Sequence, residues 1–81
     1  MTILIAPEVQ EIFSELPVRA KLKAMRSLDF LVIFPNLYPV RRRGLMKGFR
    51  YFFADSYLFY YQVRGDELRV TAVIPGVMRG A

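Results

Sequence analysis

The first third of the chain alternates apolar and polar positions with the period of a helix. Its apolar residues recur at intervals of three and four, at Val9, Ile12, Phe13 and Leu16. This spacing places them on one face of a helix over residues 7–16, which begins at Pro7 and ends near Pro17. The short β-prone segment before the helix, residues 2–6, indicates a first strand.

A second helix is predicted over residues 18–33. Apolar residues again recur at helical spacing and predict a buried face made of Leu22, Met25, Leu28 and Val32. The wetter side of the helix would carry four basic residues, Arg19, Lys21, Lys23 and Arg26. A proline disfavours the helical conformation in the residue before it, so Pro35 stops the helix. Two short helices in succession form a hairpin.

The remainder of the chain is β-prone, with strands expected over residues 49–53, 57–63 and 68–74. Turn signals of hairpin length separate these strands, which favours antiparallel pairing between neighbours. The predicted fold class is therefore α+β, with a short N-terminal strand, a helical hairpin and a three-stranded antiparallel meander. A chain of 81 residues has room for one modest core, so residues 1–81 are expected to form a single domain.

The composition excludes several kinds of chemistry, because cysteine and histidine are both absent. Disulfides, thiolate or imidazole metal sites and histidine acid–base catalysis are ruled out, and we expect neither a metal nor a cofactor. No apolar run approaches the roughly 20 residues of a membrane span, and the first residues do not resemble a secretory signal. We expect a cytoplasmic protein without a membrane partner.

Charge divides the chain into two unequal parts. Acidic and basic residues balance over residues 1–35, so residues 36–81 carry the whole net charge of +5. An asymmetry of this kind favours a polyanionic partner, either a nucleic acid or an acidic protein segment. The apolar fraction of 54% is high for so short a chain and suggests that apolar surface is left for a partner.

A basic run precedes the first strand of the meander. Four of its side chains are the candidate nucleic-acid-binding residues, Arg41, Arg42, Arg43 and Lys47. Together with two glycines they would form a phosphate-binding surface at the edge of the sheet. The alternative is an edge strand whose solvated charges only discourage aggregation.

The tyrosines lie after the helices, and alternation along a strand sends Tyr60 and Tyr61 to opposite faces of the sheet. We expect at least one of the two to be exposed. An exposed tyrosine beside arginines could stack on a base or take part in proton transfer. The alternative is that the tyrosines only cover the helices.

Several motifs occur in an order that is less common than any one of them. They are Phe34-Pro35-Asn36, the basic run, Gly48-Phe49-Arg50, Tyr57-Leu58-Phe59-Tyr60-Tyr61-Gln62-Val63, Gly65-Asp66, residues 68–74 and Arg79. The combination covers most of the chain and resembles the RelE/ParE toxin superfamily. The resemblance implies the toxin of a type II toxin–antitoxin system, whose partner is a small acidic antitoxin.

RelE-like members of that superfamily cleave mRNA in the ribosomal A site, and ParE-like members inhibit DNA gyrase. The resemblance implies Arg50, Arg79 and Tyr57 as the catalytic residues of a metal-independent endoribonuclease. The sequence departs from the nuclease pattern at Leu58, where many members carry arginine, and it ends at Ala81, before their C-terminal tyrosine or histidine. Ribosome-dependent mRNA cleavage is the leading hypothesis. The alternatives are a ParE-like gyrase inhibitor and a non-toxic basic binding module, so enzyme activity stays open.

Overall fold

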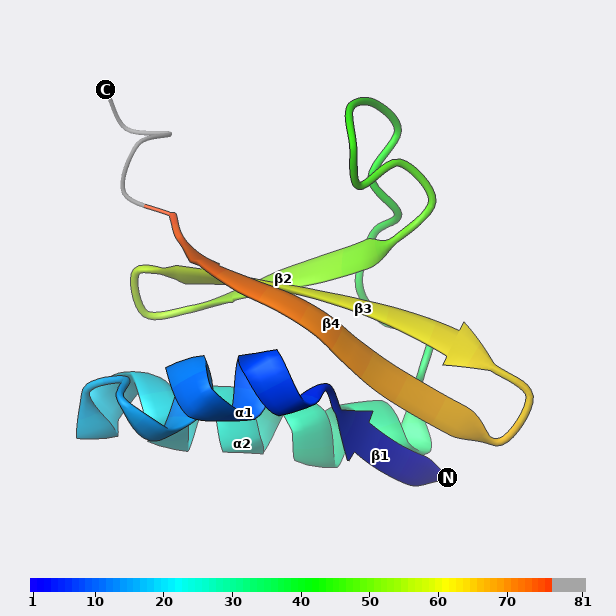
Figure 1. Ribbon diagram of the computed structural model, residues 1–81. Helices are drawn as coiled ribbons and strands as arrows, with labels where there is room; N and C mark the ends of the chain where they lie inside the picture. The colour runs from blue at the N-terminus through cyan, green and yellow to red at the C-terminus, as the bar shows by residue number, and fades with distance from the viewer. Residues whose placement is uncertain (77–81) are drawn as a thin grey trace.

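The structure is a computed structural model that describes residues 1–76. A four-stranded sheet forms one layer, and two helices form the other (Figure 1). In chain order the elements are β1 (Thr2–Ile5), α1 (Pro7–Ser14), α2 (Val18–Ile33), β2 (Arg50–Ala54), β3 (Tyr57–Arg64) and β4 (Glu67–Pro75). The predicted α+β layout is confirmed. The largest difference in bounds is at α1, which ends two residues earlier than expected.

The strands are ordered β1-β4-β3-β2 across the sheet. The meander pairs antiparallel as predicted, with Phe52 opposite Phe59 and Phe59 opposite Val73. Strand β1 pairs in parallel with β4, with Ile5 beside Val70. The first strand therefore lies next to the last, and the helical hairpin between them covers one face of the sheet (Figure 1). Within residues 1–76, no helix covers the other face.

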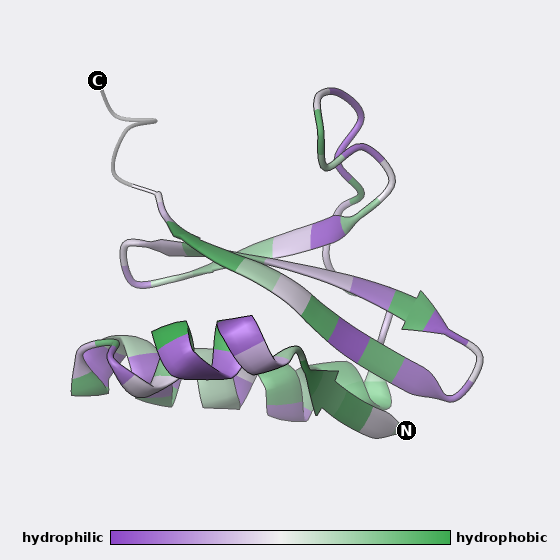
Figure 2. Ribbon diagram, viewed as in Figure 1, coloured by the Kyte–Doolittle hydropathy of each residue, from purple (hydrophilic) through white to green (hydrophobic). Residues whose placement is uncertain are grey.

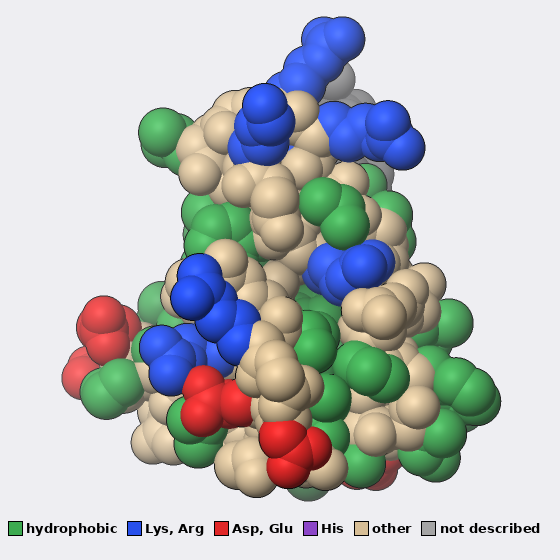
Figure 3. Space-filling view, turned by 90° about the vertical axis from the view of Figure 1, so that its right-hand side faces the viewer, with side chains coloured by type: hydrophobic (Ala, Val, Ile, Leu, Met, Phe, Trp, Pro, Cys, Tyr) green, Lys and Arg blue, Asp and Glu red, His purple; other side chains and the backbone are tan. Residues whose placement is uncertain are grey.

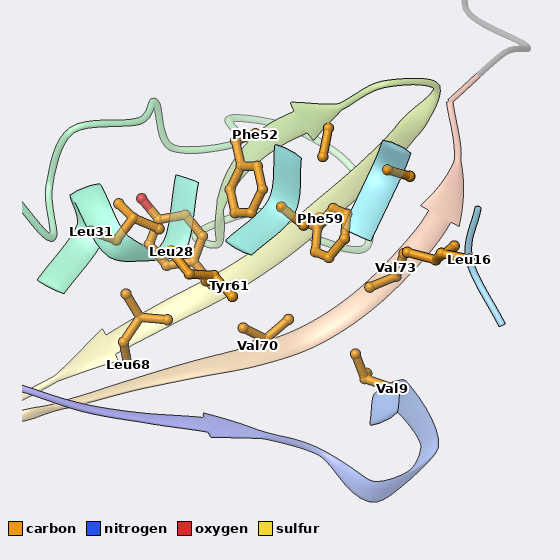
Figure 4. Packing of buried hydrophobic residues seen from close by; sticks show 13 residues of the cluster. Val9, Leu16, Leu28, Leu31, Phe52, Phe59, Tyr61, Leu68, Val70 and Val73 are labelled. Atoms are coloured by element: carbon orange, nitrogen blue, oxygen red, sulfur yellow. The ribbon is translucent and has the colours of Figure 1, made fainter. Parts of the chain in front are cut away.

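Alternation along the strands separates a helix-facing side from an open side. It is visible along β4, where hydrophobic and hydrophilic residues alternate (Figure 2). On the helix-facing side, the rings of Phe52 and Phe59 stack with centroids 4.9 Å apart and planes within 9° of parallel. Around this stack the buried cluster gathers side chains from both helices and three strands (Figure 4). Its most completely buried large members are Tyr61, Phe59, Leu31, Leu68 and Val70.

The expectation that Tyr60 or Tyr61 is exposed is wrong, since their exposed fractions are 4% and 0%. Tyr61 lies in the helix-facing core, where burial against α2 is complete. Tyr60 pairs with Tyr51 on the other side, and their ring centroids are 6.1 Å apart. A bulge in the pairing of β3 with β4 falls between Tyr60 and Tyr61. Aromatic neighbours on both sides of the sheet leave no surface for either ring.

The predicted buried face of α2 is also wrong in part. The helix buries Ala20, Ala24, Leu28 and Leu31. Three residues of the predicted face are instead exposed, Leu22 at 58%, Met25 at 54% and Val32 at 42%. Both sets follow helical spacing, but only one can face the sheet. Alanine has so small a side chain that the helix backbone can approach the aromatic residues of the sheet closely. The larger residues of the second stripe therefore point outward.

No helix in residues 1–76 has the length and apolarity needed to cross a membrane.

The close approach of α2 predicts a position-specific effect on stability. Ala24→Leu should destabilise the fold by about 1 to 3 kcal/mol, because the added atoms have no room beside the stacked rings. Met25→Leu, on the exposed side of the same helix, should change the free energy of unfolding by less than about 0.5 kcal/mol. Urea unfolding followed by circular dichroism measures both. Equal stability of the two variants would contradict the observed helix face.

Candidate nucleic-acid interface

A hydrogen-bonded loop projects from the edge of the sheet next to β2 (Figure 1). We call residues 41–48 the basic loop. Val40 forms a bridge with Arg50, the Arg41 amide donates to the Phe49 carbonyl at 2.7 Å, and the Gly48 amide donates to the Arg41 carbonyl at 2.9 Å. These bonds close the base of the loop as a short hairpin. Gly44 and Gly48 have φ values of +84° and +93°, a region that strains residues with a Cβ atom.

The four predicted nucleic-acid-binding side chains all lie on this loop and are exposed, namely those of Arg41, Arg42, Arg43 and Lys47. None of them forms an ion pair within residues 1–76, where the salt bridges involve other residues. Basic side chains gather at the end of the molecule that the loop forms (Figure 3). The structure therefore brings the four together and leaves their charges unpaired.

The segment around the loop contains the whole net charge of the protein. Residues 30–54 include five basic residues and no acidic ones, and the other seven basic residues balance the seven acidic ones. The excess charge is thus confined to the loop and its base. Cations concentrated at one end of a molecule create a local field that attracts polyanions.

Arg50 lies at the base of the loop and is half-buried. Its Nη1 atom donates to the backbone carbonyl of Tyr38 at 2.7 Å and approaches the carbonyl of Asn36 at 3.5 Å. These bonds tie residues 34–40, which we call the link segment, to the first residue of β2. The guanidinium has no carboxylate partner within the described residues. Arg50 therefore has a structural role, and its positive charge is not neutralised.

A cleft of about 230 Å³ opens beside Arg50, because β3 continues for three residues beyond its last pair with β2. Its lining residues are Asn36, Val40, Gly48, Arg50, Tyr61, Gln62, Val63 and Arg64. Gln62 and Arg64 also line an adjoining hollow of about 250 Å³ with Glu67 and Arg69. Two arginines and an amide thus surround a space open to solvent, an arrangement suited to a phosphate group.

Gln62 and Arg64 were missed as site residues in the sequence. The predicted strand over residues 57–63 leaves Arg64 in the following turn, and Gln62 has no role in it beyond its place in the tyrosine-rich run. The structure extends this strand by one residue to Arg64. Gln62 and Arg64 are two apart in it and therefore share a face. The sequence did not reveal that β2 begins at Arg50, opposite Tyr61, so that the last three residues of β3 have no partner in β2.

A tyrosine and an arginine also meet on the open side of the sheet. The Arg41 guanidinium lies 6.0 Å from the centroid of the Tyr51 ring, at the limit of a cation–π contact. Both residues line a hollow of about 340 Å³ whose other walls are mainly apolar, formed by Phe53, Leu58, Tyr60, Ile74, Pro75 and Gly76. Leu58 lies in this apolar wall.

The structure does not bring Tyr57 to Arg50. Tyr57 pairs with Ala54 at one end of β2, whereas Arg50 pairs with Tyr61 at the other end. Four residues of β3 separate the two positions, which corresponds to about 13 Å. Tyr57 also packs against the buried cluster on the helix-facing side. Arg79, the third predicted catalytic residue, lies outside the described residues.

Comparisons of the chain with known proteins give no match. No protein family, no curated protein and no solved structure matches it. The RelE/ParE resemblance therefore stays a prediction from the sequence. Within residues 1–76 there is also no group of three or more acidic, histidine or cysteine residues that could hold a metal ion. The side chains of the described site that can bind or transfer charge are its arginines, its lysine and its tyrosines.

Tyr61 joins the core to the link segment. Its hydroxyl donates to the Pro35 carbonyl at 3.3 Å. Burial raises the pKa of Tyr61 above its ordinary value, and the Tyr38 backbone and the Arg50 charge oppose this rise in part. The folded state therefore holds the phenol proton more tightly than the unfolded state does. The resulting stabilisation is complete below about pH 10 and is lost as the pH rises through the folded-state pKa.

The raised pKa predicts how Tyr61→Phe responds to alkaline pH. The variant loses one hydroxyl hydrogen bond and should be less stable by about 1 kcal/mol at neutral pH. Above about pH 10 this difference should shrink, because only the wild type is destabilised by ionisation of residue 61 in the unfolded state. Urea unfolding from pH 8 to 11 measures both proteins, and the shared titrations cancel in the difference. A difference that stays constant to pH 11 would contradict the assignment.

Proposed function

We propose that this protein is a RelE/ParE-like toxin of a type II toxin–antitoxin system that acts on translation. The observation that carries the proposal is the confinement of the net charge to the basic loop and its base, beside the cleft that contains Arg50 and Arg64. Such a surface suits a phosphate backbone. The order of the elements, a strand, a helical hairpin and a three-stranded meander, is the order that the resemblance implies.

In this proposal the basic loop binds mRNA in the ribosomal A site. The loop cations would hold the backbone, and Arg50 and Arg64 would contact a phosphate in the cleft. Arginines stabilise the charge that develops on phosphorus during attack by a 2′-hydroxyl, and the ribosome would orient that hydroxyl. A small acidic antitoxin would neutralise the toxin by covering the same cations. Both partners would place the protein in the cytoplasm.

A ParE-like inhibitor of DNA gyrase is the second candidate, and the positions of the predicted catalytic residues favour it. Arg50 donates to backbone carbonyls, and Tyr57 packs against the core away from the cleft. A protein that blocks an enzyme by binding needs no acid or base of its own. In this case the basic loop would contact gyrase or its DNA.

Induction in a bacterial host distinguishes the candidates. We expect growth arrest with mRNA cut inside reading frames if translation is the target, and relaxed plasmid DNA with intact mRNA if gyrase is. The test variant replaces Arg41, Arg42, Arg43 and Lys47 with glutamine and should abolish the arrest. The matched control removes the same charge from α2 by replacing Arg19, Lys21, Lys23 and Arg26 with glutamine, and it should remain toxic.

Normal growth with intact mRNA and normal supercoiling on induction of the wild type would contradict the toxin proposal. Arg64→Gln is a better single-residue test of the cleft than an Arg50 variant. The exposed Arg64 side chain forms no hydrogen bond within residues 1–76, whereas Arg50 holds the link segment. Arg64→Gln should weaken the arrest and leave the unfolding midpoint unchanged. Loss of folding in the Arg64→Gln variant would contradict this expectation and would show that Arg64 is needed for the fold.

Binding of a single-stranded RNA oligonucleotide should depend steeply on salt. Each phosphate contact contributes about −0.7 to the slope of the logarithm of the binding constant against the logarithm of salt concentration. Removing the four loop cations should therefore flatten the slope by about 3. The α2 control should keep a slope close to that of the wild type. Fluorescence anisotropy at salt concentrations from about 50 to 300 mM measures the slopes of the wild type and the variants. Equal slopes for the two variants would contradict the assignment of the loop.

A further inference from the structure

An apolar side chain lies at the tip of the basic loop. Leu45 is 101% exposed, as much as it would be in an extended peptide. Single exposed leucines are common on protein surfaces. This one differs because four unpaired cations surround it in the same eight-residue loop. Met46, the other apolar residue of the loop, is half-buried, so Leu45 projects alone.

The tip that presents Leu45 is held by its own backbone. The Lys47 amide donates to the Gly44 carbonyl at 3.1 Å, and the Phe49 amide donates to the Met46 carbonyl at 3.0 Å. With the bonds at the base of the loop, these contacts fix the backbone on both sides of Leu45. A tip that is already ordered loses little conformational entropy when it binds.

We propose that the basic loop is a wedge for base-paired nucleic acid, in which the cations bind the two phosphate backbones and Leu45 inserts between neighbouring base pairs. Apolar wedges of this kind partly unstack a base step and bend the duplex. The major groove of B-DNA admits two hydrogen-bonded chain segments side by side. The base of the loop consists of two such segments, joined by the Val40–Arg50 bridge and the bond from the Arg41 amide to the Phe49 carbonyl. The inference rests on the nucleic-acid contact of the proposed function, and not on toxicity or RNA cleavage.

Charge and shape favour this occupant over the two others that cations and a leucine could attract. An anionic membrane would be held by one leucine only, which buries too little apolar surface for stable anchoring. An acidic protein such as the antitoxin could cover the cations, but its interface would extend well beyond the narrow loop and would not require one leucine at the tip. A nucleic-acid wedge needs only one side chain between flanking phosphate contacts, and that is the arrangement of Leu45 among Arg42, Arg43 and Lys47.

Fluorescence of 2-aminopurine tests the wedge, because this base brightens when it unstacks. The probes are one RNA duplex and one DNA duplex that carry it at a central pyrimidine–purine step. Wild-type protein should raise the fluorescence of at least one duplex. Leu45→Ala should abolish this rise and weaken binding roughly tenfold, as expected when a leucine side chain loses its burial. Its salt slope should stay unchanged, because no cation is removed.

Two variants serve as controls. Leu45→Met keeps an apolar side chain of similar size and should preserve the fluorescence rise. Leu22→Ala removes an exposed leucine from α2 and should behave as the wild type does.

The failures of the two proposals are distinguishable. Binding without any fluorescence rise, or a rise that survives in Leu45→Ala, overturns the wedge and leaves the charge contact intact. No binding by the wild type to any nucleic acid overturns both. Leu45-dependent binding to phosphatidylglycerol vesicles, with no effect of Leu45→Ala on either duplex, overturns the wedge in favour of a membrane.

Discussion

The close approach of α2 to the sheet is the contact on which the remaining structure depends. Ala20 and Ala24 allow the helix backbone to lie near the stacked rings of Phe52 and Phe59. This contact fixes where α2 ends relative to β2, and therefore the point from which the link segment leaves the helix. Arg50 and Tyr61 then bind carbonyls of the link segment and hold it to the sheet. The basic loop starts directly after this anchored segment.

The distribution of charge separates the molecule into a balanced body and a positive end. Acidic and basic residues balance outside residues 30–54, and the ion pairs of Asp55 with Arg19 and Lys23 connect α2 to the turn after β2. Cations crowded on one loop repel one another, and this repulsion opposes folding. Their presence, unpaired and held on a hydrogen-bonded hairpin, is the basis for proposing a polyanion that binds there. The cleft beside Arg50 extends the same surface onto β3.

Helix α2 has two apolar stripes, and the local sequence does not determine which of them is buried. The stripe that contains Ala20, Ala24, Leu28 and Leu31 faces the sheet, whereas the larger side chains of Leu22 and Met25 are exposed. Hydrophobicity alone favours burial of the larger residues. Shape decides otherwise, because the stacked rings fill the space that large helix residues would need. The high apolar fraction of the chain is thus explained partly by side chains on the outer side of this helix.

The sequence by itself determined the elements, their order and the location of the excess charge. These features depend on neighbours in the chain: helical spacing over residues 7–33, alternation and turns over residues 49–74, and the run from Arg41 to Lys47. Tertiary structure decided which face of α2 is buried, that β1 pairs with β4, and that Tyr60 and Tyr61 are both covered. It also placed Arg64 beside Arg50 and kept Tyr57 away from it. Each of these outcomes depends on packing and strand register between distant segments, which no local pattern specifies.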